Sequence, residues 1–509
     1  MRSDGAVRTP GPEGAVDEPA CEESAGVRVR SRVRQRLKRL ASIDERSLAV
    51  FRVGIAIAVL VDLILRAGDL GSLYSDAGAL PRSLAAADSS LSSHVFPLYF
   101  FNGSALWAGA LLVLTGITAT TLLVGYRSFS STAATWYLIS CLHARSSTLT
   151  LAGDDLLRML LLWGLVLPLG ASGSIDDRLA RPSARSRTVS IASLVVLVHL
   201  SALLFFTPLV AAQRGSKLLT IGLVDALEVD HLVTGWGATL RRVPDIVGYA
   251  DLSLAGLLIL GTILLWSPIA TAQLRSLVVL FLVQLQILGV APAFHLGSQP
   301  WVAACGLMLF APTWLWNQFT EASQAAVQPV TQTSGAPRST SGRDLAAAGL
   351  AIVALGSLLQ TALPASVNEG ATSTLAIVSR QLGIQPTPLV LATVPPTDDG
   401  WLATRGQLAN GSSVDPLRRR QFSYEEPEDS PEIPGGARWR RHLRWLSTDG
   451  PIGMRSALLG YLCHRWNTSH EAGSALLDIQ LILMLEGQDG EEGVSTALPV
   501  PLAQHRCER

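Results

Sequence analysis

Charge and lysine are scarce in this chain. Only 16% of its 509 residues are charged, and Lys38 and Lys217 are its two lysines. Hydrophobic residues make up 49% of the sequence and the mean hydropathy is +0.34, values that are unusual for a soluble protein of this length. The composition therefore indicates a membrane protein.

Cysteine is scarce as well. The five cysteines include no CxxC pair and are too scattered to predict a disulfide scaffold or a zinc site. Cys141 and Cys305 fall in apolar runs and are interpreted as small core residues. Cys463 and Cys507 lie in the tail, where a disulfide can form if that tail is outside the cytoplasm, and the sequence leaves their pairing open. A Walker loop, a Rossmann fingerprint, a nucleophile elbow and an HExxH motif are absent, and no metal is predicted.

Long apolar runs are abundant. About nine of them lie between Leu48 and Leu363, most of them near the roughly 20 residues that a helix needs to cross a bilayer. Inside lipid every backbone amide must be paired within the segment, so these runs predict helices. We expect an all-α polytopic bundle of about nine spans, followed by a small α+β domain. The expected spans are 48–65, 105–124, 131–142, 156–169, 189–210, 252–266, 274–290, 301–316 and 345–363.

Arginine placement predicts the orientation. The loop 171–188 carries Arg178, Arg181, Arg185 and Arg187, and the segment 317–344 carries Arg338 and Arg343. If the N terminus is cytoplasmic, both segments follow an even number of crossings and lie in the cytoplasm. A basic run over 28–39 fits a cytoplasmic anchor better than a nucleic-acid-binding arm. We predict a multi-pass protein of the cell membrane with an extracytoplasmic tail, in contact with lipid and not with nucleic acid.

Five segments follow from this pattern. The predicted divisions are a disordered basic cytoplasmic segment 1–40, a transmembrane domain 41–320, a polar cytoplasmic linker 321–343, a last transmembrane helix 344–364 and an extracytoplasmic domain 365–509. The tail is expected to fold because Trp401, Trp439 and Trp445 supply aromatic anchors and the run 476–486 suits a buried strand or helix.

Four charged residues are assigned structural roles. Arg52 is near one end of the first span, where its side chain can extend to the headgroups. Asp62 precedes Arg66 by four residues, a spacing that allows an ion pair on a helix. Asp154 is expected to cap the next helix and to pair with Arg158, which is also four residues on.

Polar groups at membrane depth are the candidate catalytic residues. Titratable groups there usually face a bundle interior or an aqueous cavity. His143, Arg145 and His295 are predicted to meet Asp154 in one cavity beneath the outer face. His199, near the middle of the fifth span, suits a neutral imidazole bonded to another helix as well as a proton relay.

Acidic residues also gather after the fifth span. Asp225, Glu228, Asp230 and His231 lie among apolar residues. This spacing suits a metal site or the wet side of an amphipathic helix, and the solvated helix face is the preferred interpretation.

Several motifs together resemble a known membrane family. They are Arg52 with Asp62, residues 74–78, His143-Ala-Arg145, 153–158, Trp163, 167–170, His295 before Trp301, 310–312 and, in the tail, 399–401, Asp415, 438–439 and 461–467. In order and spacing they resemble the HTTM (horizontally transferred transmembrane) family, the membrane domain shared with vitamin K-dependent gamma-carboxylases. The resemblance covers most of the chain after residue 41 and makes 41–320 an HTTM-like domain.

That resemblance implies a chemistry with a reduced quinone. A deprotonated quinol reacts with oxygen to give a base that removes a glutamyl proton before carbon dioxide adds, and a lysine takes the quinol proton. Here the expected position holds Phe206 or a neighbour, and Lys217 lies on a later loop. We therefore expect a divergent bacterial member without carboxylase activity, in which Lys217 is either a displaced base or an ordinary interfacial cation. The alternative is a quinone- or lipid-dependent membrane enzyme.

Overall fold

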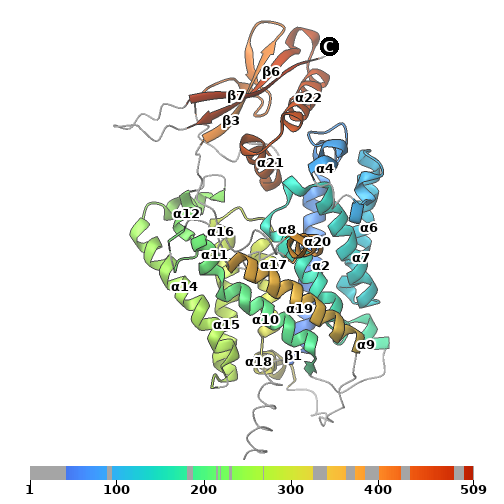
Figure 1. The fold of residues 1–509 in the computed structure, drawn as a ribbon, viewed down its shortest axis with the longest axis vertical. Helices are drawn as coiled ribbons and strands as arrows, with labels where there is room; N and C mark the ends of the chain where they lie inside the picture. Colours follow the sequence, from blue (N-terminus) through green and yellow to red (C-terminus); the bar gives the residue numbers. More distant parts are fainter. Residues whose placement is uncertain are drawn as a thin grey trace, which may run out of the picture.

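The computed structural model describes residues 42–88, 94–179, 187–213, 216–217, 219–228, 232–267, 269–324, 341–362, 373–384, 400–425, 436–485 and 498–507. Predictions for the segment 1–40 and for most of the linker 321–343 lie outside these residues. The described part is mostly helical, with a five-stranded antiparallel sheet at one end (Figure 1).

The helical body begins with a short strand and runs to α20. Its two strands, β1 (Ser42–Asp44) and β2 (Arg187–Val189), pair antiparallel. Its helices are α2 (Glu45–Ala67), α3 (Leu70–Leu73), α4 (Arg82–Asp88), η1 (Leu98–Phe100), α6 (Ala105–Val124), α7 (Ser128–Arg145), η2 (Ser147–Leu149), α8 (Ala152–Val166), α9 (Ile175–Leu179), α10 (Ile191–Phe205), α11 (Thr207–Gln213), α12 (Leu223–Glu228), α13 (Gly235–Leu240), α14 (Pro244–Trp266), α15 (Ala272–Gln284), η4 (Leu285–Val290), α16 (Ala291–Ala293), α17 (Gln299–Leu307), η5 (Met308–Phe310), α18 (Thr313–Gln324), α19 (Ser341–Ala362) and α20 (Ser373–Leu382).

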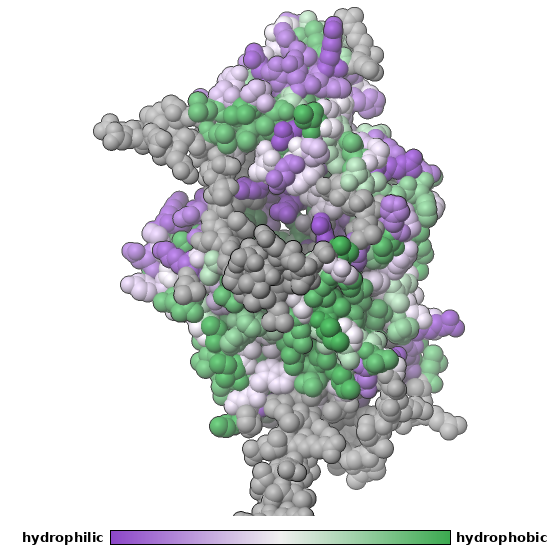
Figure 2. All heavy atoms as spheres, viewed as in Figure 1, coloured by the Kyte–Doolittle hydropathy of each residue, from purple (hydrophilic) through white to green (hydrophobic). Residues whose placement is uncertain are grey.

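Four helices of the described chain are long and apolar enough to cross a bilayer. They are α2, α6, α14 and the continuous helical segment Ala272–Ala293 that α15, η4 and α16 form. In each of these helices, at most 44% of the 18-residue apolar stretch is buried inside the protein. Large apolar faces therefore point outward. Figure 2 shows apolar side chains gathered over the helical body and polar ones over the end that carries the sheet. The chain is therefore a multi-helix membrane protein.

The other five expected spans also coincide with helices, but these helices are shorter or less apolar. Three of them end or break several residues before the predicted end. The run 156–169 ends at Val166, before Leu167 and Pro168. The run 189–210 breaks at Phe206, before Pro208, and the run 301–316 breaks at Ala311, where the backbone becomes extended before Pro312. Proline lacks a backbone N–H and disfavours helical geometry in the residue before it. The count of nine crossings stays a prediction.

Helix α2 is the centre of the body. It packs against α6, α8, α17 and η5, while α7 lies between α6 and α8 and α19 crosses α10. Asp44 caps α2 by accepting a 2.9 Å hydrogen bond from the Arg46 backbone N–H. Phe51, Ile55 and Val59 are fully buried along one side of α2. This packing places the last turn of α2 beside the first turn of α8.

The C-terminal unit combines a sheet with two helices. The strands are β3 (Gly400–Leu408), β4 (Ser413–Asp415), β5 (Arg420–Gln421), β6 (Leu476–Leu485) and β7 (Leu498–Arg506), in the order β5-β4-β3-β6-β7. Helix α22 (Ile452–Ser469) packs on β6 and β7, and α21 (Gly436–Thr448) contacts the helical body. Pro499 and Pro501 are tolerated in β7 because it is an edge strand. The sheet and these helices agree with the predicted α+β tail.

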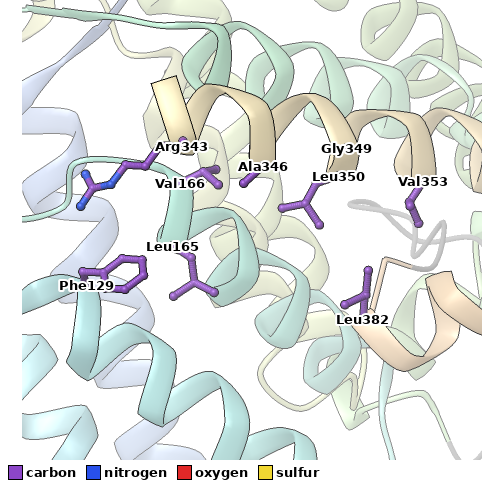
Figure 3. Close-up of a pocket in the computed structure, with 10 residues that line it drawn as sticks. Phe129, Leu165, Val166, Arg343, Ala346, Gly349, Leu350, Val353 and Leu382 are labelled. Carbon is purple, nitrogen blue, oxygen red and sulfur yellow. The ribbon is translucent and has the colours of Figure 1, made fainter. Parts of the chain in front are cut away.

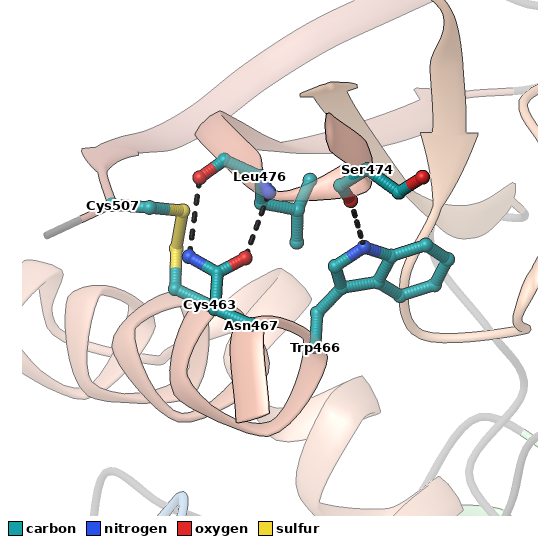
Figure 4. The surroundings of a disulfide bond; sticks show 6 residues. All are labelled: Cys463, Trp466, Asn467, Ser474, Leu476 and Cys507. Atoms are coloured by element: carbon teal, nitrogen blue, oxygen red, sulfur yellow. Dashed lines mark hydrogen bonds between the residues drawn. A yellow bond between two sulfur atoms is a disulfide. The ribbon is translucent and has the colours of Figure 1, made fainter. Parts of the chain in front are cut away.

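A disulfide ties α22 to the end of β7. Cys463 bonds to Cys507, with their Cα atoms 5.5 Å apart. Beside it, Asn467 donates to the Leu476 carbonyl (3.2 Å) and accepts from the Leu476 N–H (2.7 Å), and the Trp466 indole donates to the Ser474 carbonyl (3.0 Å) (Figure 4). The pairing that the sequence left open is thus present, and it joins positions 44 residues apart.

Candidate functional site

A buried cluster of charged residues lies where the helical body meets the C-terminal unit. Its centre is Arg66, in the last turn of α2. The Arg66 guanidinium binds Asp62 Oδ2 at 2.7 Å, Asp154 Oδ2 at 3.0 Å and the Tyr74 hydroxyl at 2.8 Å. Arg66, Asp62 and Asp154 are all at least 97% buried. The pair of Asp62 and Arg66 that the four-residue spacing predicts is present.

The fourth member of this cluster comes from the C-terminal unit. Arg438, in the first turn of α21, contacts Asp62 Oδ1 and lies 3.1 Å from Asp154 Oδ1. Each carboxylate thus contacts both guanidinium groups. Two positive and two negative charges face one another, which compensates the cost of burying each charge alone. We call Asp62, Arg66, Asp154 and Arg438 the four-charge cluster.

His143 adjoins this cluster from α7. Its Nε2 lies 3.3 Å from Arg66 Nη2, and its Nδ1 has no hydrogen-bond partner among the described residues. Asp62, His143 and Asp154 each offer a ligand atom within 4.8 Å of the others, a grouping that could hold a metal ion. The two guanidinium groups already neutralise both carboxylates, however, so a cation would have to displace them.

The start of α8 explains how Asp154 reaches the cluster. Its Oδ2 accepts a 3.1 Å hydrogen bond from the Leu151 backbone N–H, which caps the helix as predicted. Gly153 permits the close approach of the loop before α17, since a Cβ there would lie 2.4 Å from the Gln299 nitrogen. The predicted ion pair between Asp154 and Arg158 is wrong. Arg158 donates instead to the Arg380 carbonyl of α20 at 2.7 Å, because Asp154 is held by two other arginines.

Two further arginines stabilise loops. Arg145 donates to the Leu80 carbonyl at 2.6 Å. Arg52 donates to the carbonyls of Leu169 (2.8 Å), Ser172 (3.2 Å) and Gly173 (2.8 Å), and it is only 1% exposed. The prediction that Arg52 extends to the headgroups is therefore wrong, because a loop folded back onto α2 supplies carbonyl acceptors for its guanidinium.

The remaining candidates have described contacts with residues other than the four-charge cluster. His199 accepts a 3.0 Å hydrogen bond from the Trp163 indole of α8, which is the interhelical bond considered above. Lys217 is exposed in the loop after α11. The backbone N–H of His295 donates to the Leu232 carbonyl at 2.6 Å, and burial together with Arg440 lowers the pKa of its imidazole. Of the four residues predicted to line one cavity, His143 and Asp154 both contact Arg66, and the common cavity stays a prediction.

The acidic group after the fifth span is only partly described. Asp225 and Glu228 belong to α12, a short helix in which Glu228 is exposed and Asp225 half-buried. Asp230 and His231 lie outside the described residues. The choice between a metal site and a solvated helix face stays a prediction.

Helix α21 makes further contacts on either side of Arg438. The Trp439 indole donates to Asp69 Oδ1 at 3.1 Å, and His442 Nδ1 lies 3.4 Å from the Thr148 hydroxyl. Burial lowers the pKa of His442 to about 4. Sequence reasoning missed Arg438, Asp69 and His442 as site residues. Charge balance was the available signal. Asp62 and Asp154 paired with Arg66 alone leave one buried negative charge, which calls for a second cation.

Comparison of the chain with protein-family models, with curated proteins and with solved structures finds no match. The relation to the HTTM family stays a prediction from the motifs. What the described residues show is a multi-helix membrane protein whose C-terminal unit docks on the helices through a neutral, buried set of ion pairs.

Proposed function

We propose that this chain is a multi-pass membrane protein, distantly related to the HTTM family, that holds its C-terminal unit rigidly on the outer ends of its helices and does not carboxylate glutamyl peptides. The observation that carries this proposal is the four-charge cluster. Arg438 enters from a separate unit, 376 residues away in the sequence from Asp62. A buried charge that crosses between units favours one docked position, because undocking leaves two carboxylates with one guanidinium.

The same cluster argues against proton abstraction. A general base needs an unoccupied lone pair within reach of its substrate. Asp62 and Asp154 each face two guanidinium groups, and Lys217 is exposed on a loop after two helices. These two carboxylates and Lys217 therefore do not fit the deprotonation of a reduced quinone, and no step of this proposal passes through one.

An extracytoplasmic position for the C-terminal unit is part of the proposal. Structural disulfides persist in oxidising compartments, and Cys463–Cys507 lies in this unit. Helix α9, whose sequence includes Arg178, is at the opposite end of the helical body (Figure 1). Cationic residues favour the cytoplasmic side, so both features support the same orientation.

A carboxylation assay tests the absence of activity. Purified wild type and Lys217→Ala are incubated with a glutamyl peptide, reduced quinone and labelled bicarbonate. We expect incorporation at background level in both proteins, and no quinone in an organic extract of the wild type. Incorporation by the wild type that disappears in Lys217→Ala would contradict the proposal and identify Lys217 as the base.

A further inference from the structure

An open groove runs along the helical body, away from the four-charge cluster. Its volume is 760 Å³, and it lies between α19 on one side and α7, α8 and α20 on the other. Figure 3 shows Leu165 and Val166 of α8 facing α19, with Phe129 and Arg343 at one end and Val353 and Leu382 at the other. Apart from Arg343, all the residues that line it are apolar or glycine.

Small residues on α19 keep this groove open. Gly342, Ala346 and Gly349 lie on the face that lines it. A Cβ added at Gly342 or at Gly349 would meet nothing within 4 Å, so neither glycine is required for helix packing. Glycine inside a helix costs about 1 kcal/mol relative to alanine. The apolar groove therefore leaves room for a hydrocarbon chain.

One end of the groove is cationic. Arg343 is half-buried, with its guanidinium 5.5 Å from the centre of the Phe129 ring. Phe129 and Arg343 also line a second recess of 420 Å³, together with Arg127, Ser128, Ser130 and Asp176. Its residues carry two positive charges and one negative charge, which gives a net charge of about +1.

The carboxylate in this recess is already bound. Asp176 accepts hydrogen bonds from the Arg127 N–H (2.8 Å), the Ser128 N–H (2.7 Å) and the Ser128 hydroxyl (2.7 Å). Burial alone would raise its pKa, but these hydrogen bonds from Ser128 and Arg127, with Arg52 nearby, hold the pKa of Asp176 below its ordinary value. Asp176 therefore fixes the loop, while Arg127 and Arg343 remain available to an anion.

We propose that the groove and the adjoining recess bind one anionic phospholipid. An acyl chain lies along α19 against Leu165 and Val166, and the phosphate is held by Arg343 and Arg127. This occupant is favoured because a long apolar groove that ends at cationic side chains matches an amphiphile with an anionic head. The recess is at the end of the helical body opposite the C-terminal unit, so the lipid comes from the leaflet on that side.

Native mass spectrometry of the detergent-purified full-length protein tests the proposal. The probes are phosphatidylglycerol and phosphatidylcholine with identical oleoyl chains. We expect wild type to retain phosphatidylglycerol in preference to phosphatidylcholine. Arg343→Gln should weaken retention of phosphatidylglycerol about tenfold, the factor for one charge-assisted hydrogen bond. Arg178→Gln, an exposed arginine at the same end, should behave as wild type.

A second pair of variants tests the apolar part. Gly349→Trp places an indole in the groove and should abolish retention of both lipids, while Leu345→Trp, on α19 but outside the groove, should not. Equal retention of the two lipids by wild type, or equal effects of Arg343→Gln and Arg178→Gln, would overturn the proposal. Displacement of the lipid by inorganic phosphate alone, or a change in oligomeric state with Gly349→Trp while lipid retention is unchanged, would also overturn it.

Discussion

Charge balance at four residues explains the strongest link between the two parts of this molecule. Asp62 and Arg66 are one helical turn apart, so their pairing follows from the sequence. The capping role of Asp154 follows from its position in the first turn of α8. The contribution of Arg438 did not follow, because a contact between positions 376 residues apart depends on how the C-terminal unit docks. Arg158 was misassigned for the same reason, since its acceptor is on α20.

Removing the guanidinium of Arg438 should loosen the C-terminal unit. Arg438→Met leaves two buried carboxylates facing Arg66 alone, which costs about 3–5 kcal/mol. We expect hydrogen exchange across α21 to accelerate strongly. Arg441→Met, an exposed arginine on the same helix, is the control and should change little. Adding Asp62→Asn to Arg438→Met restores neutrality and should recover part of the protection. Equal exchange in the two single variants would rule out the role of the cluster.

At the scale of helices and strands, apolar runs predicted where helices form better than where they end. All nine runs coincide with helices, yet Pro208 and Pro312 divide two of them. Proline is visible in the sequence, and its effect could have been anticipated. The strand order of the tail could not, because β3 pairs with β6 across two helices and the register depends on long-range packing.

The docking of α21 should weaken in mild acid. The pKa of His442 is lowered to about 4 by burial, whereas an exposed histidine has a pKa near 6.5. Between these two pKa values, His442 binds a proton in the undocked state but not in the docked state. The contribution of His442 to docking is therefore fully present above pH 6.5 and is lost as the pH falls toward 4. The expected loss between pH 7.5 and pH 5 is roughly 2 kcal/mol.

Thermal melting followed by tryptophan fluorescence measures this effect, since Trp439 and Trp445 flank His442. The melting temperature of wild type should fall between pH 7.5 and pH 5, and His442→Gln should reduce that fall. His464→Gln, an exposed histidine on α22, should keep the wild-type dependence. A fall of the same size in His442→Gln would show that other groups cause it.

At the scale of the whole molecule, the C-terminal sheet caps one end of an apolar helical body, and α9 lies at the other end (Figures 1 and 2). Composition predicted a membrane domain followed by a folded tail, because apolar runs stop before the tail begins. The docking of that tail could not be predicted from the sequence. It depends on contacts that Arg438, Trp439 and His442 make with residues of α2, α8 and their loops.

The orientation of the C-terminal unit is the central claim, and reporter fusions in a bacterial host measure it most directly. Fusions after Ser183 and after Asn410 carry either alkaline phosphatase, which is active outside the cytoplasm, or a cytoplasmic fluorescent protein. We predict fluorescence after Ser183 and phosphatase activity after Asn410, because the arginine-rich loop stays inside and the unit with Cys463–Cys507 lies outside. Fluorescence after Asn410 without phosphatase activity would contradict the account.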